Sequence, residues 1–166
     1  MNPIVVKFGG SSLATAGQFE KVAAIIRENP GRRYVVASAP GKRFSGDTKV
    51  TDLLYRCYDA ACAGQDFAPA LGEIRQRFAD IISELQLQVD LAPDFAAIEA
   101  HLRTSPQRDY MASRGEYLNS KLLAAYLGFA FADAAQMVLF RADGSFDAEA
   151  TNTAIGHALV SIDRAV

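Results

Sequence analysis

Residues 5–12 read Val-Val-Lys-Phe-Gly-Gly-Ser-Ser, and this stretch decides the fold. A short apolar strand over residues 3–8 runs into the glycine turn, and Tyr34–Ser38 has the pattern of a second buried strand. Between them, apolar residues recur at helical spacing, namely Phe19, Val22, Ala23 and Ile26. A strand, a helix and a strand within about forty residues predict a βαβ unit with two parallel strands. We therefore expect an α/β fold.

The glycine turn itself suggests a phosphate site. Backbone N–H groups at such a turn can face an anion, and glycines such as Gly9 and Gly10 let a phosphate approach closely. Lys7 would add a point charge beside Ser11 and these glycines. The alternative is that the glycines serve only the packing of the strand against the helix.

Helical periodicity dominates from about residue 50 to residue 127. The strongest apolar stripe comprises Leu71, Ile74, Phe78, Ile81, Ile82 and Leu85. Residues 129–132 and 137–140 predict short strands, and Asp147 predicts the N-cap of a last helix over 148–165. Because such a helix normally leads into another strand, we expect an incomplete domain with an exposed sheet edge.

The composition excludes several classes of protein. Of 166 residues, 50% are hydrophobic, and 17 Lys and Arg nearly balance 19 Asp and Glu, so nothing favours nucleic acid or an acidic membrane as a partner. No stretch approaches a signal peptide or a membrane span, and we expect a cytoplasmic protein. Cys57 and Cys62 turn away from each other on a predicted helix, so both are expected to be buried free thiols.

Other phosphate and metal motifs are absent. No Gly-x-x-x-x-Gly-Lys-Ser/Thr and no Gly-x-Gly-x-x-Gly occurs, which excludes a Walker-type loop and argues against a dinucleotide fold. His101 and His157 have no carboxylate or cysteine at ligand spacing, so no metal held by the protein is expected.

Three further residues are candidates for ligand contacts. Ser38 ends the second strand, at the carboxyl edge where open α/β sheets bind substrates. Thr51 opens a helix, where it could cap the helix, contact a substrate carboxylate, or do both. Glu116 belongs to a polar helical stripe with Ser113 and Ser120, which is either a solvated face or a site for a substrate ammonium group.

Taken in order, four segments resemble aspartate kinases of the amino-acid kinase superfamily. They are Val6–Ser12, Ser38–Lys42 running into Asp47–Leu54, Ser113–Asn119, and Tyr126–Phe129 with Phe131–Ala134. The resemblance implies a three-layer α/β/α fold with a mainly parallel sheet, in which this chain is the N-terminal lobe with a helix-rich insert at about 50–127. It also implies ATP-dependent phosphorylation of the side-chain carboxylate of L-aspartate, with Mg²⁺ carried by the nucleotide.

By motif match, Lys7 is similar to the lysine that steadies the transferring phosphoryl group, and Gly9, Gly10 and Ser11 to the turn around it. Ser38 and Thr51 match positions that contact aspartate, and Glu116 matches a glutamate that pairs with the amino group of aspartate.

The chain departs from the family pattern in lacking a second glycine-rich segment, the nucleotide lobe and the ACT regulatory domains. We therefore expect residues 1–166 to be the aspartate-binding part of a kinase domain, with little or no kinase activity alone. Two alternatives stay open. One is another amino-acid kinase, acting on glutamate, acetylglutamate, carbamate or a nucleotide. The other is a non-enzymatic binding module that associates through the exposed sheet edge, with itself or with another chain.

Overall fold

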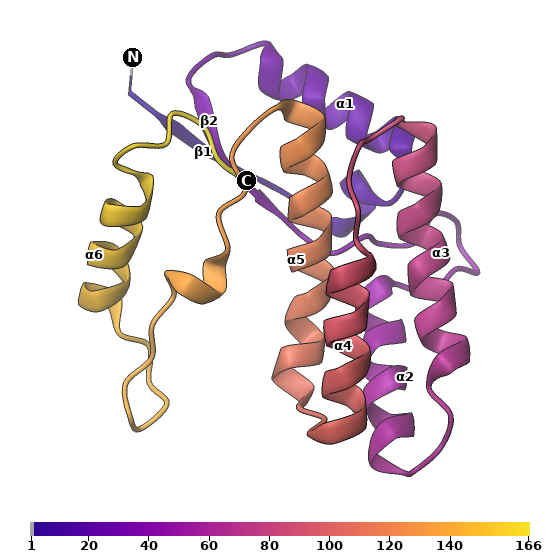
Figure 1. The fold of residues 1–166 in the computed structure, drawn as a ribbon. Coiled ribbons are helices and arrows are strands. Elements are labelled where there is room, and N and C mark those ends of the chain that lie inside the picture. Colours follow the sequence, from indigo (N-terminus) through magenta and orange to yellow (C-terminus); the bar gives the residue numbers. More distant parts are fainter. Residues whose placement is uncertain (1) are drawn as a thin grey trace.

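The computed structural model describes residues 2–166 (Figure 1). Two strands, β1 (Ile4–Phe8) and β2 (Arg32–Ala37), are joined by a 3₁₀ turn, η1 (Gly10–Leu13), and a helix, α1 (Ala16–Arg27). The helices that follow are α2 (Val50–Cys62), α3 (Ala68–Glu84), α4 (Ala92–Thr104) and α5 (Arg108–Leu127). A second 3₁₀ turn, η2 (Ala134–Gln136), precedes the last helix, α6 (Ala148–Leu159).

The two strands form the parallel βαβ unit that the sequence predicts. β1 pairs with β2 so that Val6 lies opposite Val35 and Phe8 opposite Ala37. This register turns the side chains of Val35 and Ala37 into the core, whereas Val5 and Val36 point to the opposite face and are exposed. Helices therefore cover the face of the sheet that carries Val35 and Ala37, and the other face is bare at Val5 and Val36.

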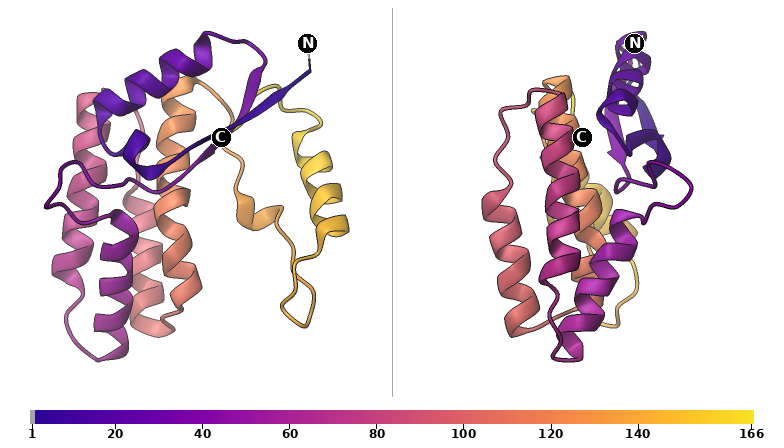
Figure 2. Two further views of the ribbon diagram at one scale, coloured as in Figure 1. Left: turned by 180° about the vertical axis from the view of Figure 1, so that it is seen from behind. Right: turned by 90° about the vertical axis from the view of Figure 1, so that its right-hand side faces the viewer.

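Helices α2 to α5 form a layer of elongated helices beside the sheet (Figures 1 and 2). Each helix follows an apolar stripe visible in the sequence, and these stripes meet in one core. The largest fully buried side chains include Leu53 and Leu54 of α2, Ile74 and Phe78 of α3, Ile98 of α4, and Met111, Leu118 and Leu122 of α5. The predicted helix-rich insert is thus confirmed, and α5 ends where Gly128 adopts the left-handed conformation, with φ of 72°.

The C-terminal part differs from the prediction. Asp147 does cap α6, because its carboxylate accepts a hydrogen bond from the Ala150 N–H. However, α6 ends at Leu159 rather than near residue 165, and the last residues run back to the sheet. Ala165 pairs in parallel with both Tyr34 and Ala130, so it lies between β2 and residue 130.

The two short strands expected at 129–132 and 137–140 are not formed as strands. Only single bridges occur, at Ala130 with Ala165 and at Phe140 with Phe146. Phe140 and Phe146 are both more than half exposed, so this hairpin does not bury its apolar residues against the rest of the chain. The β-propensity of these residues predicted strands, but a strand is stable only where its apolar side chains are also buried. That burial is missing here, which explains the wrong prediction.

Two smaller observations complete the fold. Cys57 is buried, as expected, but Cys62 is exposed, and both thiols are free. In the part of the chain from residue 2 onwards, none of the helices combines the length and the apolar character needed to cross a membrane.

Candidate functional site

Two glycine segments meet backbone to backbone at the carboxyl end of β1. The Gly41 N–H donates a hydrogen bond of 2.8 Å to the carbonyl of Gly10. A Cβ added to Gly10 would lie 2.6 Å from the Ala39 carbonyl oxygen, and one added to Gly41 would lie 2.7 Å from the Gly10 carbonyl carbon. No side chain fits at either position, so these two glycines have a packing role.

Lys7, Gly9 and Ser11 surround this contact. Lys7 is exposed on β1, and its ammonium nitrogen lies 3.9 Å from the position that a Cβ on Gly9 would take. Gly9 precedes the η1 turn, and Ser11 is an exposed residue of that turn. The Lys7 ammonium group thus lies beside the glycine turn, which is an arrangement that suits an anion.

Ser38 lies next to the same turn and is held from two sides. Its N–H donates to the Phe8 carbonyl at 3.1 Å, which extends the pairing of β1 and β2 by one residue. Its carbonyl accepts a 2.6 Å hydrogen bond from the side-chain amide of Asn119, which is fully buried on α5. Helix α5 approaches so closely because Gly115 packs on Ala39, where a Cβ on Gly115 would lie 2.6 Å from the Ala39 Cβ.

Glu116 follows Gly115 and is half-buried. Its Oε2 atom is inaccessible to solvent and has no hydrogen-bond partner, and the same is true of the Asn119 Oδ1 atom one turn further along α5. Glu116 is therefore partly solvated, with one of its two carboxylate oxygens shielded from water. Buried acceptors without donors are rare, and they are costly unless a ligand or water completes them.

Thr51 lies in the first turn of α2, which is anchored beside the same segment. The Val50 N–H donates to the Pro40 carbonyl at 3.1 Å. The N-cap of α2 is Lys49, with no side-chain cap, so Thr51 is not the capping residue. The first turn of a helix presents N–H groups without intrahelical partners, and a substrate carboxylate is a suitable acceptor for them.

One residue near this region was missed by the sequence analysis. Arg77 is 4% exposed on α3 and bonds to the loop between β2 and α2. A signal was present, because residue 77 falls three after Ile74 and four before Ile81, on the apolar stripe of that helix. A charged residue on a buried stripe needs partners, and here they are in the loop.

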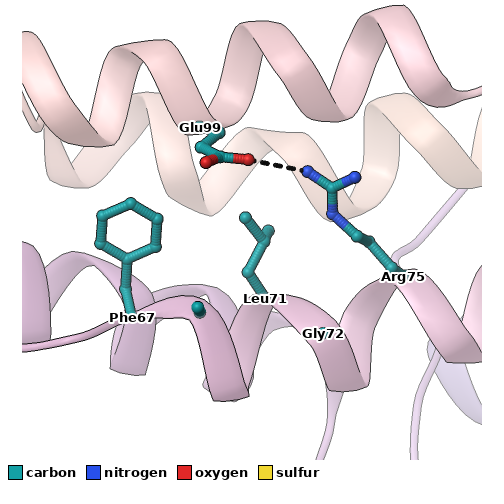
Figure 3. Close-up of a pocket in the computed structure, with 6 residues that line it drawn as sticks. Phe67, Leu71, Gly72, Arg75 and Glu99 are labelled. Carbon is teal, nitrogen blue, oxygen red and sulfur yellow. Dashed lines mark hydrogen bonds and ion pairs between the residues drawn. The ribbon is translucent and has the colours of Figure 1, made fainter.

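A hollow elsewhere on the surface is separate from these residues. It has a volume of about 280 Å³ between α3 and α4 and is lined by Phe67, Ala68, Leu71, Gly72, Arg75 and Glu99 (Figure 3). Arg75 and Glu99 form an ion pair of 3.0 Å across it, so their charges are already matched. None of the predicted site residues lines this hollow.

Comparison with known proteins now identifies the family. The sequence model that describes the amino acid kinase family matches residues 2–160 of this chain. The chain belongs to the amino acid kinase family. Within it, the chain is 42% identical over 133 residues to aspartokinase 3 of Bacillus subtilis (strain 168), a match that covers 75% of this chain and 29% of that protein.

Solved structures agree with this assignment. The crystal structure of Clostridium acetobutylicum aspartate kinase superposes with a TM-score of 0.96 at 41% identity, over 100% of this chain and 38% of that one. Escherichia coli aspartokinase III, solved in complex with aspartate and ADP, has the same fold, with a TM-score of 0.74 at 20% identity over 96% of this chain and 38% of that one. The resemblance to aspartate kinases and the α/β fold class are therefore confirmed. The chain spans less than two fifths of the length of these relatives.

Proposed function

We propose that this chain forms the substrate- and phosphate-binding part of an aspartate kinase, which uses ATP to phosphorylate the side-chain carboxylate of L-aspartate to 4-phospho-L-aspartate. That reaction is the entry step to lysine, threonine and methionine. Family membership supports the proposal, and one observation carries it: the Glu116 Oε2 atom is buried without a donor. An amino-acid ammonium group that contacts the accessible part of this half-buried residue supplies hydrogen-bond donors and the opposite charge.

Substrate binding falls to three residues in this proposal. The Glu116 carboxylate accepts hydrogen bonds from the ammonium group of L-aspartate. The Ser38 hydroxyl and the first turn of α2 at Thr51 donate to its carboxylates. Because Gly115 packs on Ala39 and Asn119 bonds to Ser38, these groups sit on rigid elements rather than on mobile loops.

Phosphate binding falls to the turn after β1. Lys7 places a positive charge over Gly9, and the backbone N–H groups of Gly9, Gly10 and Ser11 face the phosphoryl group in this proposal. In this proposal ATP would supply the phosphoryl group, and the Mg²⁺ that it carries would neutralise part of the negative charge on the phosphates. Phosphoryl transfer needs no covalent nucleophile from the protein, so positioning and charge neutralisation by these residues suffice.

The described residues do not form a site for a metal ion of their own. From residue 2 to residue 166, no three His, Cys, Asp or Glu side chains gather closely enough to hold a metal. Mg²⁺ prefers oxygen ligands and commonly binds through substrate phosphates, so we expect it to arrive with ATP. A cytoplasmic location, low activity of the chain alone and association through the sheet stay predictions from the sequence.

Isothermal titration of L-aspartate tests the substrate half of the proposal. We expect saturable binding to the unmodified chain and to the control Glu20→Gln, which alters an exposed glutamate on α1. Glu116→Gln should bind at least tenfold more weakly, because a hydrogen bond between charged groups contributes about 1.5–3 kcal/mol. A folded chain that binds L-glutamate or N-acetylglutamate but not L-aspartate would favour another amino-acid kinase.

Titration of a non-hydrolysable ATP analogue with Mg²⁺ tests the phosphate half, because ADP lacks the phosphoryl group that Lys7 is proposed to contact. Lys7→Met should weaken binding about tenfold, since it removes a charge that contacts a phosphate. Lys21→Met is the matched control, because Lys21 is an exposed lysine on α1, away from the turn. Equal affinities of the two variants would contradict the role of Lys7.

A further inference from the structure

One buried side chain of α3 holds both ends of the loop between β2 and α2. Arg77 donates a hydrogen bond of 2.5 Å to the Gly41 carbonyl and one of 2.6 Å to the Thr48 carbonyl. The tip of this loop is exposed, and the Phe44 ring is 63% exposed. The loop therefore gets little support from apolar burial, and Arg77 clamps its base.

Asp47 completes the clamp. Its Oδ2 atom lies 3.4 Å from the Arg77 guanidinium and accepts hydrogen bonds from the Arg43 N–H at 2.9 Å and from Arg43 Nε at 2.8 Å. Asp47 is itself mostly buried, so its charge is compensated by two arginines. Three charged side chains thus form a network whose backbone acceptors all lie in one loop.

The clamped loop touches the proposed site at both ends. At one end, the Gly41 N–H donates to the Gly10 carbonyl, so Arg77 is one residue removed from the turn after β1. At the other end, Thr48 comes shortly before Thr51, in the first turn of α2. A planar guanidinium can bond two carbonyls in fixed geometry, which a lysine or an apolar residue cannot do.

We infer that Arg77 is a positioning residue of this site, which sets the spacing between the phosphate-binding turn at Gly10 and the substrate-binding end of α2 without touching either ligand. The predicted effect of Arg77 on L-aspartate binding rests on the proposed function. Its predicted effect on the spacing between the turn at Gly10 and the start of α2 does not. This positioning role predicts that loss of the guanidinium loosens the η1 turn and the first turn of α2 together, although they are different elements.

The test compares four variants of the chain by amide exchange without ligand and by titration of L-aspartate. Arg77→Met removes the clamp, and Arg77→Lys keeps the charge but reaches fewer carbonyls. Arg75→Met is the charge-matched control, because Arg75 is exposed and pairs with Glu99. Ile74→Val is the stability-matched control, because Ile74 is fully buried on the same helix.

The N–H groups of Ser12, Gly41 and Val50 are hydrogen-bonded to backbone carbonyls in and beside this loop. We expect Arg77→Met to speed amide exchange at these three residues at least tenfold and to weaken L-aspartate binding at least tenfold, with Arg77→Lys intermediate. Neither control should change these two readouts. If exchange at these amides changes only as much as the global stability does, and by the same factor in Ile74→Val and Arg77→Lys, the inference is overturned. If Arg77→Met does not fold, Arg77→Lys decides. If the unmodified chain binds no L-aspartate, the proposed function fails, and amide exchange alone decides the role of Arg77.

Discussion

Gly115→Ala should separate α5 from the end of β2. The added Cβ would lie 2.6 Å from the Ala39 Cβ, whereas carbon atoms pack best at about 3.5–4.0 Å. Because the Ala39 Cβ is fixed to the backbone, α5 must move by about 1 Å, and such overpacking costs about 1–3 kcal/mol. Alanine is a better helix former than glycine by about 1 kcal/mol, so the net loss of stability is about 0–2 kcal/mol.

Gly72→Ala isolates the packing contribution. Gly72 lies in α3, is exposed, and an added Cβ would meet nothing within 4 Å. Both substitutions gain the same helix propensity, so their stabilities should differ by the overpacking cost of about 1–3 kcal/mol. Thermal unfolding followed by circular dichroism should place the midpoint of Gly72→Ala above that of the unmodified chain, by about 2–4 °C per kcal/mol. Midpoints that rise equally in both variants would refute the close approach of α5 to Ala39.

Further predictions concern Asp47, Gly10 and the two cysteines. Hydrogen bonds from Arg43 hold the pKa of Asp47 well below its usual range despite burial. The stability from this shift is present in full above about pH 4, the unfolded pKa, and is lost as the pH falls further. The deficit of Asp47→Asn in urea unfolding should therefore be largest near pH 7 and shrink below pH 4, and a deficit independent of pH would contradict the ion network. Gly10→Ala should destabilise the chain more than Gly17→Ala, because of the two only Gly10 has a backbone oxygen where the Cβ would lie. The midpoints of urea unfolding measure this difference, and equal midpoints would contradict the close contact at Gly10. Burial raises the pKa of Cys57 to about 11, so iodoacetamide at pH 8 should label only Cys62, and Cys62→Ser should abolish fast labelling.

The sequence predicts the βαβ unit and the helical insert because both depend on local periodicity. The apolar stripe of α3 and the stop at Gly128 are visible without any tertiary contact. The short strands expected at 129–132 and 137–140 and the end of α6 were mispredicted for the opposite reason. Both depend on which surface is available for burial, and the pairing of Ala165 between β2 and Ala130 has no local signature.

For the site, local motifs predict residue types, whereas the geometry comes from contacts between elements far apart in the sequence. The glycine turn and Glu116 stand out as patterns, but the fit of Gly41 onto Gly10 and of Gly115 onto Ala39 does not. Arg77 could have been singled out as a charge on an apolar stripe. Its partners, the carbonyls of Gly41 and Thr48, could not have been, since backbone carbonyls have no sequence signal.

The central claim is that the carboxyl end of β2, the first turn of α2 and the middle of α5 meet to bind L-aspartate. Titration of L-aspartate into the ¹⁵N-labelled chain, followed by amide chemical shifts, tests it most directly. The account predicts shifts that saturate and cluster at Ser38, Thr51 and Glu116, and that vanish in Glu116→Gln. Shifts confined to the hollow between α3 and α4, or no shifts at millimolar L-aspartate, would contradict it.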